Sequence, residues 1–205
     1  MNKKSIYVYI SATLALLVPA PGRFACGILL VLELNVLMFV GTLLRSAVKQ
    51  LNLVHLGTIL LISMLVAFTM LMRQCIALVV PAAALQLGFV MYLPTVSSFL
   101  IGYIFGDESL SLHQAMARNM THVFFYSIFA LFFFLMRDIL GFGTITFVTS
   151  RGIVEKVLFN SSRITLMTFF ASIPGALVCT AVILMLYVFI VAKFKIIENA
   201  ERSDD

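Results

Sequence analysis

Long uncharged runs of hydrophobic residues alternate along the sequence with short stretches that hold most of the charges. The longest run, Cys75–Phe105, has 31 residues without an acidic or basic side chain. As one straight helix it would be about 46 Å long at about 1.5 Å per residue, whereas the hydrocarbon core of a bilayer is about 30 Å thick. The pattern therefore predicts membrane helices and requires this run to be divided.

Prolines supply the division, because a proline inside a helix removes a backbone hydrogen bond and clashes with the preceding turn. We expect Ile76–Leu85, around Pro81, to lie at the membrane interface, and the following membrane segment to break within Met91–Ser98. The six predicted membrane segments are Ile6–Val18, Phe24–Leu44, Leu56–Met72, the later part of Cys75–Phe105, Asn119–Met136 and Ser172–Ala192.

The first and fourth predicted segments are both interrupted by proline. Ile6–Val18 has only 13 uncharged residues, against the roughly 20 that a full span needs. Matching interruptions in two halves of a membrane protein indicate inverted repeats with a site between half-helices. The positions at the breaks are Val18, Pro19, Pro94, Ser97 and Ser98.

These features predict an all-α integral membrane protein with one domain, 1–205, in which two inverted three-segment repeats occupy 1–75 and 76–197. The mixed, glycine-containing stretch 140–163 is expected to form an amphipathic surface connection. The charged tail 198–205 is expected to be solvated. With the N-terminus inside, inner loops hold eight Lys and Arg residues and outer loops six, which slightly favours that orientation.

The composition supports a membrane location. The chain is 62% hydrophobic and 11% charged with a mean hydropathy of +1.10, whereas a soluble domain of this size buries only about 70% of its surface. The lipid bilayer is therefore a partner. The net charge of +5 does not indicate nucleic acid, because the basic residues lie between apolar runs, where they set topology and contact headgroups.

A cleaved signal peptide is an alternative interpretation of the N-terminus, since Lys3 and Lys4 precede a short apolar run. It is disfavoured because no clean small-x-small cleavage site precedes Gly22 and further apolar runs follow.

One acidic residue, Glu33, and one amide residue, Asn35, fall inside the second predicted segment. A carboxylate such as Glu33 in mid-membrane costs roughly 2.5 kcal/mol or more, so Glu33 is either an ion or proton site or a structural carboxyl hydrogen-bonded to another helix. Asn35 points about 200° away from Glu33 around the helix. For Asn35 an interhelical hydrogen bond is the favoured interpretation.

Other candidate groups are weaker. Cys26, Cys75 and Cys179 are far apart and form no metal-binding pattern with one another or with histidine. Arg137 and Asp138, after the fifth segment, could anchor a partner subunit or order the surface connection, or could mark an ordinary helix end at the headgroups.

Five motifs, in order, resemble a known family. They are LLVPAPG, ELNVLMFVGTLLR, FVMYLPTVSSFLIG, RDILGFGTITF and IPGALV. In length and segment order the chain resembles subunits A and E of the Rnf electron-transport complex and subunits D and E of the sodium-translocating NADH:quinone reductase, Nqr. The most specific match is similar to the family's Arg-Glu-x-Leu-Gly-x-Gly-Thr and comprises Arg137, Asp138, Gly141, Gly143 and Thr144.

The resemblance implies six segments in inverted repeats, with broken first and fourth helices, in a bacterial cytoplasmic membrane. Family members pair with a homologous subunit of opposite topology. Each contributes two cysteines from its broken helices, and the four together hold an iron or 2Fe-2S centre. That centre passes electrons between flavin or iron-sulfur subunits, coupled to movement of Na⁺ or H⁺.

This chain departs from the family at both cysteine positions. The residue before the first proline is Val18, and Ser97, Ser98, Phe99 and Leu100 follow the fourth segment's proline. Valine cannot bind iron, and a serine hydroxyl is a poor substitute for a thiolate. Cys26 lies seven residues beyond Pro19, and nothing near Pro94 could partner it.

We therefore expect a membrane subunit of an Rnf/Nqr-type complex with a structural or ion-path role, no metal or cofactor of its own, and at most a non-catalytic part in the oxidoreductase. The alternatives are a stand-alone inverted-repeat transporter or channel that has lost electron transfer, and a redox subunit with another ligand set.

Overall fold

The computed structural model describes residues 12–50, 56–105, 111–149, 152–158, 169–183, 185 and 189, and it is mostly helical. Four of its helical stretches are long and apolar enough to cross a membrane: α2 (Phe24–Gln50), α3 (Gly57–Val79), the interrupted stretch Pro81–Phe105, and α7 (Leu112–Phe142). The chain is thus a multi-pass, mainly helical membrane protein by length and composition of its helices. Of the first and last predicted segments, the structure describes only η1 (Thr13–Leu17), with the residues that flank it, and the apolar helix Ile173–Ile183 with scattered residues beyond.

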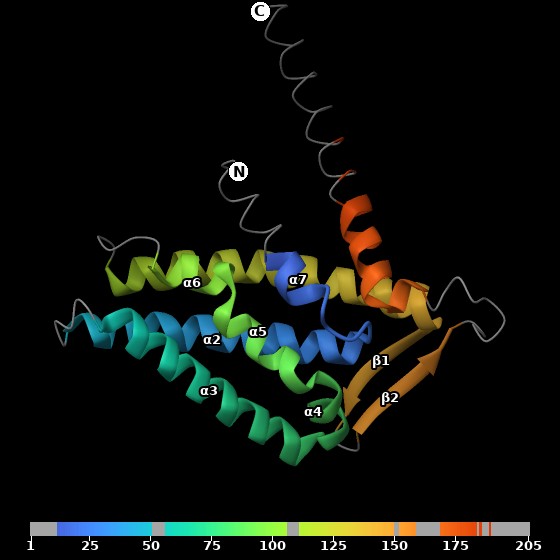
Figure 1. The fold of residues 1–205 in the computed structure, drawn as a ribbon, viewed down its shortest axis with the longest axis horizontal. Helices are drawn as coiled ribbons and strands as arrows, with labels where there is room; N and C mark the ends of the chain where they lie inside the picture. The colour runs from blue at the N-terminus through green and yellow to red at the C-terminus, as the bar shows by residue number, and fades with distance from the viewer. Residues whose placement is uncertain are drawn as a thin grey trace, which may run out of the picture.

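Helices α2 and α7 lie side by side along the longest axis of the molecule and run in opposite directions (Figure 1). Their contacts show the antiparallel order, because Gly27 meets Phe134 and Thr42 meets Asn119. Buried side chains from both helices, including Leu34, Leu37, Val123 and Phe133, contribute to the same core. The pair forms the centre on which the shorter elements pack.

The stretch from Pro81 to Phe105 is a series of short helical pieces. It comprises α4 (Pro81–Leu87), the 3₁₀ helix η2 (Gly88–Tyr92), α5 (Leu93–Val96) and α6 (Ser98–Phe105). Proline suits the first turn of a helix, where its missing N–H is not needed, and Pro81 and Pro94 occupy such positions in α4 and α5. Ser97 is extended, with ψ of 140°, so the backbone is interrupted between α5 and α6.

Several predicted helix ends are wrong, and the end of α3 is the clearest example. Leu56–Met72 was expected to end before Arg73, with Ile76–Leu85 at the interface, but α3 continues to Val79. Arg73 is exposed, so its charge does not have to end the helix. The chain turns at Val80, immediately before Pro81, whereas the interruption at Ser97 lies inside the expected window Met91–Ser98.

The connection predicted at 140–163 also differs from the structure. Leu140–Phe142 belong to α7, and the chain then forms a hairpin of β1 (Thr144–Thr149) and β2 (Gly152–Val157). The strands are antiparallel, with Thr144 opposite Val157 and Thr149 opposite Gly152. The run of β-branched residues in TITFVT favours an extended strand over an amphipathic helix. The part of the chain that the structure describes is therefore mainly helical with one small sheet.

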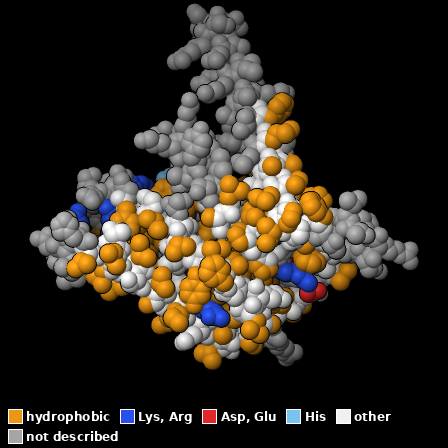
Figure 2. Space-filling model, in the orientation of Figure 1, with side chains coloured by type: hydrophobic (Ala, Val, Ile, Leu, Met, Phe, Trp, Pro, Cys, Tyr) orange, Lys and Arg blue, Asp and Glu red, His pale blue; other side chains and the backbone are white. Residues whose placement is uncertain are grey.

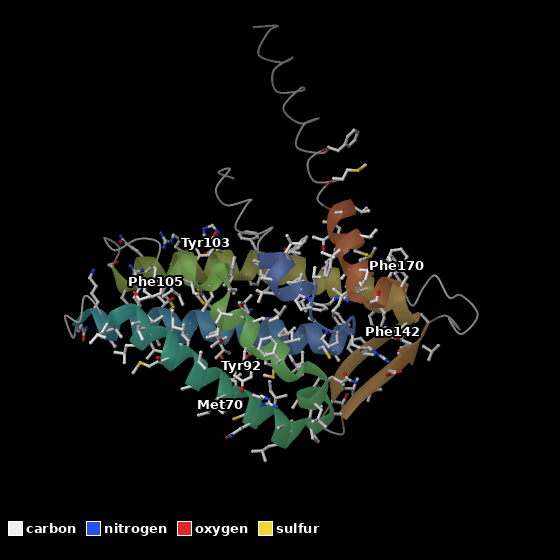
Figure 3. All side chains as sticks on the ribbon, viewed as in Figure 1. Met70, Tyr92, Tyr103, Phe105, Phe142 and Phe170 are labelled. Carbon is white, nitrogen blue, oxygen red and sulfur yellow. The ribbon has the colours of Figure 1, made fainter. Side chains whose placement is uncertain are left out.

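Hydrophobic side chains cover most of the described surface in the view of Figure 2. The exposed hydrophobic residues of the described chain include Ile59, Met64, Met70 and Leu71 of α3. The helices end at two opposite poles of the molecule. Tyr103 and Phe105 of α6 lie at one pole, and Phe142 of α7 and Phe170 lie at the other (Figure 3). An apolar surface between two poles is the arrangement expected of helices in lipid.

Candidate functional site

The two segments that the sequence predicts to be broken are in contact where the structure describes them. η1 contacts α5, and Leu16, Leu17 and Pro94 line one small cavity of about 20 Å³. The remaining lining comes from the central helix pair: Leu30, Val31, Leu34, Tyr126, Ala130 and Phe134. Apart from the hydroxyl of Tyr126 these side chains are apolar, so the space between the breaks has the chemistry of a hydrophobic core.

The predicted break positions serve packing and capping. Val18 is buried in the core beside Leu16 and Leu17. The hydroxyl of Ser97 donates to the carbonyl oxygen of Pro94 at 2.7 Å and accepts from the N–H of Leu100 at 3.2 Å, as a helix N-cap does. Ser98 is the first residue of α6, but its side chain lies outside what the structure describes.

Arg137 binds the carbonyl ends of two segments. Its Nη1 donates to the carbonyl oxygens of Leu17 and Ala20, both at 3.0 Å, and its Nη2 donates to that of Ala171 at 2.9 Å. The side chain is only 1% exposed. A guanidinium at the carbonyl end of a helical segment satisfies oxygens that have no intrahelical partner and interacts favourably with the helix dipole. Arg137 thereby fixes the end of the first broken segment against α7.

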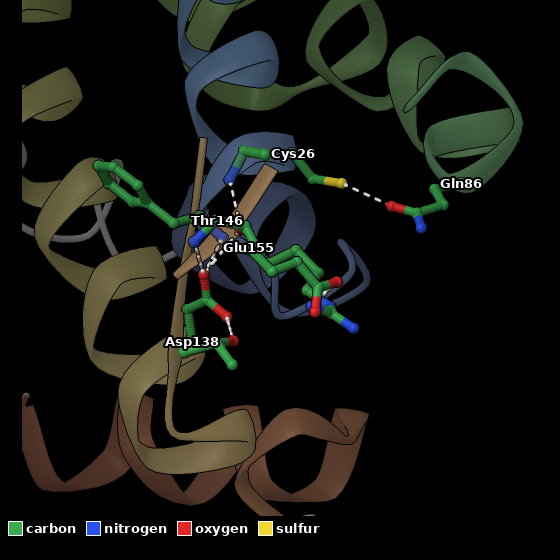
Figure 4. A network of polar contacts seen from close by, with 9 residues as sticks. Cys26, Gln86, Asp138, Thr146 and Glu155 are labelled. Carbon is green, nitrogen blue, oxygen red and sulfur yellow. Dashed lines mark hydrogen bonds and ion pairs between the residues drawn. The ribbon is translucent and has the colours of Figure 1, made fainter. Parts of the chain in front are cut away.

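Asp138 binds the amide end of α2 and the beginning of β1. Its Oδ2 accepts from Phe24 N at 3.1 Å, from Thr146 N at 2.8 Å and from Thr146 Oγ1 at 2.7 Å, while its Oδ1 accepts from Thr144 Oγ1 at 3.1 Å (Figure 4). Thr146 Oγ1 in turn accepts from Ala25 N at 3.0 Å. A carboxylate stabilises the N-terminal turn of a helix, so Asp138 holds the start of α2 to the hairpin.

The two glycines of the same motif have steric roles. A Cβ on Gly141 would overlap Ala171, so glycine permits the segment around Ala171 to approach α7. Gly143 has a φ of 65° and ends α7 in the left-handed conformation that glycine adopts most readily. We call Arg137, Asp138, Gly141, Gly143 and Thr144, with the groups that they contact, the α7 junction.

The sequence placed the five motif residues of the α7 junction together, but it did not identify Thr146 or Ala171 as their partners. Thr146 could have been found, because it lies two residues after Thr144 and therefore on the same face of a strand. No sequence pattern identifies the backbone oxygen of Ala171 as a partner of Arg137.

Glu33 lies in the middle of α2 and is 0% exposed. Neither of its carboxyl oxygens has a hydrogen-bond partner among the described residues. Cys26, about two turns earlier, donates to Gln86 of α4 at 3.5 Å, and Gly41, about two turns later, faces Leu65 of α3 and Ile104 of α6. Helical periodicity therefore directs Glu33 toward the side of α2 that α3 and the stretch α4–α6 cover.

Asn35 faces a different helix. Its Nδ2 donates to Ser127 Oγ of α7 at 2.7 Å and to the carbonyl oxygen of Val31 at 2.7 Å. The first of these contacts is an interhelical hydrogen bond of the kind that the sequence favours for Asn35. The structure does not bring Asn35 and Glu33 together.

The described residues contain no group of three or more His, Cys, Asp or Glu side chains that could hold a metal ion. Their three cysteines are free thiols in different environments: Cys26 is buried, Cys75 exposed and Cys179 intermediate.

Comparison of the sequence with models of known protein families and with curated proteins gives no match. The structure thus defines a class, a multi-pass, mainly helical membrane protein in which η1 contacts α5 of the interrupted stretch Pro81–Phe105.

Proposed function

We propose that this chain is a membrane subunit of an Rnf/Nqr-type ion-translocating electron-transport complex in a bacterial cytoplasmic membrane, with a structural or ion-path role and without an iron centre of its own. The observation that carries the proposal is the α7 junction. The motif that is most specific to the resemblance is hydrogen-bonded to the end of the first predicted broken segment through Arg137 and to the start of α2 through Asp138. The meeting of η1 with α5 supports the same proposal.

The chemistry of the meeting point supports a role without iron. The valine at the first expected ligand position packs in the core, and the hydroxyl of Ser97 is engaged in capping α6. Iron in proteins of this kind requires thiolate or imidazole ligands. Electrons would therefore pass through partners that carry flavin or iron-sulfur groups, among them a homologous membrane subunit of opposite topology.

The proposal is tested by purifying the tagged full-length chain from its native membranes in a mild detergent and identifying co-purifying chains by mass spectrometry. We expect a homologous membrane subunit together with flavin or iron-sulfur subunits. Recovery as a lone monomer would contradict the complex. An iron-dependent absorption spectrum of the chain after its partners have been removed would contradict the absence of an iron centre.

A stand-alone transporter or channel is the second candidate, and Glu33 is the observation that favours it. A buried carboxyl without a hydrogen-bond partner among the described residues costs free energy in a membrane helix, and such residues are rare there. Ion flux by the isolated chain in liposomes that is lost in Glu33→Gln and kept in Glu155→Gln would support this candidate. The control changes an exposed carboxyl on β2.

A further inference from the structure

Glu33 has no compensating charge from the elements that pack around it. Helix α4, η2, α5, α6 and β1 contain no Asp, Glu, Lys, Arg or His. On α3 the charged residue is Arg73, which is exposed near the end of the helix. No ion pair joins Glu33 to any residue that the structure describes.

The charged and histidine side chains of α7 have other partners or lie near its beginning. Arg118 donates to the carbonyl oxygen of Tyr103 and to Asn119, and the ring of His122 stacks on that of Tyr103. Arg137 and Asp138 belong to the α7 junction. His113 lies in the exposed first turn of α7.

Three carbonyl oxygens at the breaks already accept hydrogen bonds from side chains. In membrane proteins with discontinuous helices, free carbonyl groups at the ends of half-helices coordinate Na⁺. Here the carbonyl oxygens of Leu17 and Ala20 bind the guanidinium of Arg137, and that of Pro94 binds the hydroxyl of Ser97. Arg137 thus supplies a fixed positive charge where a mobile cation would bind.

From this arrangement we propose that Glu33 is a proton-binding site, neutral in the packed state described here, and that the ion it takes is H⁺ and not Na⁺. A carboxyl group in an apolar interior, without a cation or donors to stabilise its charge, keeps its proton. The inference names H⁺ as the ion for the ion-path role in the proposed function. The protonation of Glu33 does not depend on that function, whereas the use of Glu33 in ion transport does.

Release of the proton requires water to reach Glu33, because the carboxylate would otherwise be left unsolvated. Helix α3 is the element best placed to move and open a path for water, since few of its side chains are buried in the packed state. The proton would bind when α3 packs against α2 and leave when the two helices separate. Only the carboxyl O–H bond forms and breaks in this step, and water accepts or supplies the proton.

Infrared spectroscopy of the purified full-length chain, labelled with ¹³C-glutamate, tests the inference. At neutral pH we expect the carbonyl stretching band of a protonated carboxylic acid to shift with the label, to be absent in Glu33→Gln and to remain in Glu155→Gln. Transfer to D₂O should shift the band as the proton exchanges. Replacing sodium chloride with choline chloride at constant ionic strength should leave it unchanged.

Two results would overturn the inference: no label-sensitive acid band in the wild type, or a band that Na⁺ removes. If Glu33→Gln does not fold, Glu33→Asp keeps the carboxyl and should move the band to the aspartic acid frequency, insensitive to the glutamate label. The measurement needs no partner subunit, so its failure is distinct from failure of the complex to co-purify.

Discussion

Arg137 and Asp138 are adjacent and oppositely charged, yet each binds backbone ends instead of the other. Arg137 binds carbonyl oxygens at the end of η1, and Asp138 binds an amide at the start of α2. Both side chains are at most 1% exposed, so neither reaches lipid headgroups. The sequence left three interpretations of the pair open: an ordinary helix end at the headgroups, an anchor for a partner subunit, or ordering of the surface connection. Their contacts with distant segments could not be read from local pattern.

Asp138→Asn should destabilise the protein strongly, on the order of 3 kcal/mol, because hydrogen bonds to a charged group contribute about 1.5–3 kcal/mol each. The amide NH₂ of asparagine would also face donors that now point at a carboxylate oxygen. Unfolding by sodium dodecyl sulfate in mixed micelles measures the change.

Glu155→Gln is the control for Asp138→Asn. It removes the ion pair between Glu155, whose side chain is 48% exposed, and Arg23, whose side chain is 25% exposed. Exposed ion pairs contribute about 0–1 kcal/mol to stability. Equal stability of the two variants would show that the α7 junction does not depend on the charge of Asp138.

At the scale of the elements, hydropathy predicted the central helices well and their ends poorly. The sequence treated charged residues as helix ends, but α3 passes Arg73 and α7 passes Arg137 and Asp138. An arginine at a helix surface can reach water, and the junction residues find buried hydrogen-bond partners. The hairpin was missed because its strand pattern is short and its stability depends on contacts with α2 and α7.

Gly27→Ala should weaken the packing of α2 against α7. A Cβ at Gly27 would overlap the ring of Phe134, and overpacking typically costs about 1–3 kcal/mol. Gly102→Ala is the matched control, because among the described residues no atom apart from its chain neighbours and its own helix backbone lies within 4 Å of its Cβ position. In the control, loss of glycine flexibility should stabilise α6 by about 0.5–1 kcal/mol. Thermal unfolding in detergent should shift in opposite directions for the two variants.

Ser97→Ala tests the interruption between α5 and α6. Loss of an N-cap hydroxyl costs about 1 kcal/mol, and here it also frees the N–H of Leu100 in the core. Ser63→Ala is the comparison, since the Ser63 hydroxyl is exposed and donates to the carbonyl oxygen of Ile59 in its own helix. If the Ser97→Ala variant were as stable as the Ser63→Ala variant, the Ser97 hydroxyl would not stabilise the protein as a cap.

For the whole molecule, charged side chains mark two poles. Arg45 and Arg118 bind the last carbonyl groups of α6, at Ile104 and Tyr103. Arg23 lies at the other pole, where it contacts Glu155 of the hairpin and the ring of Phe142. The sequence predicted the same partition, because cations after the second segment and before the fifth were assigned to one side. The pole that faces the cytoplasm is predicted from the slight excess of Lys and Arg residues in the loops on one side.

Thiol labelling of intact cells decides that orientation. With the N-terminus inside, the end of α3 faces outward, and the exposed Cys75 should react with a membrane-impermeant maleimide before the cells are permeabilised. Thiols react as thiolates in water, so buried Cys26 should react slowly from either side. Cys75→Ser should lose the rapid labelling.

Gln50→Cys in the Cys75→Ser background places an exposed thiol at the opposite pole, at the end of α2. It should react only after permeabilisation, because α2 and α3 carry the chain from one pole to the other. Reversal of both results would place the N-terminus outside and the α7 junction on the cytoplasmic side. Labelling of both thiols in intact cells would mean that the two poles are not separated by a membrane.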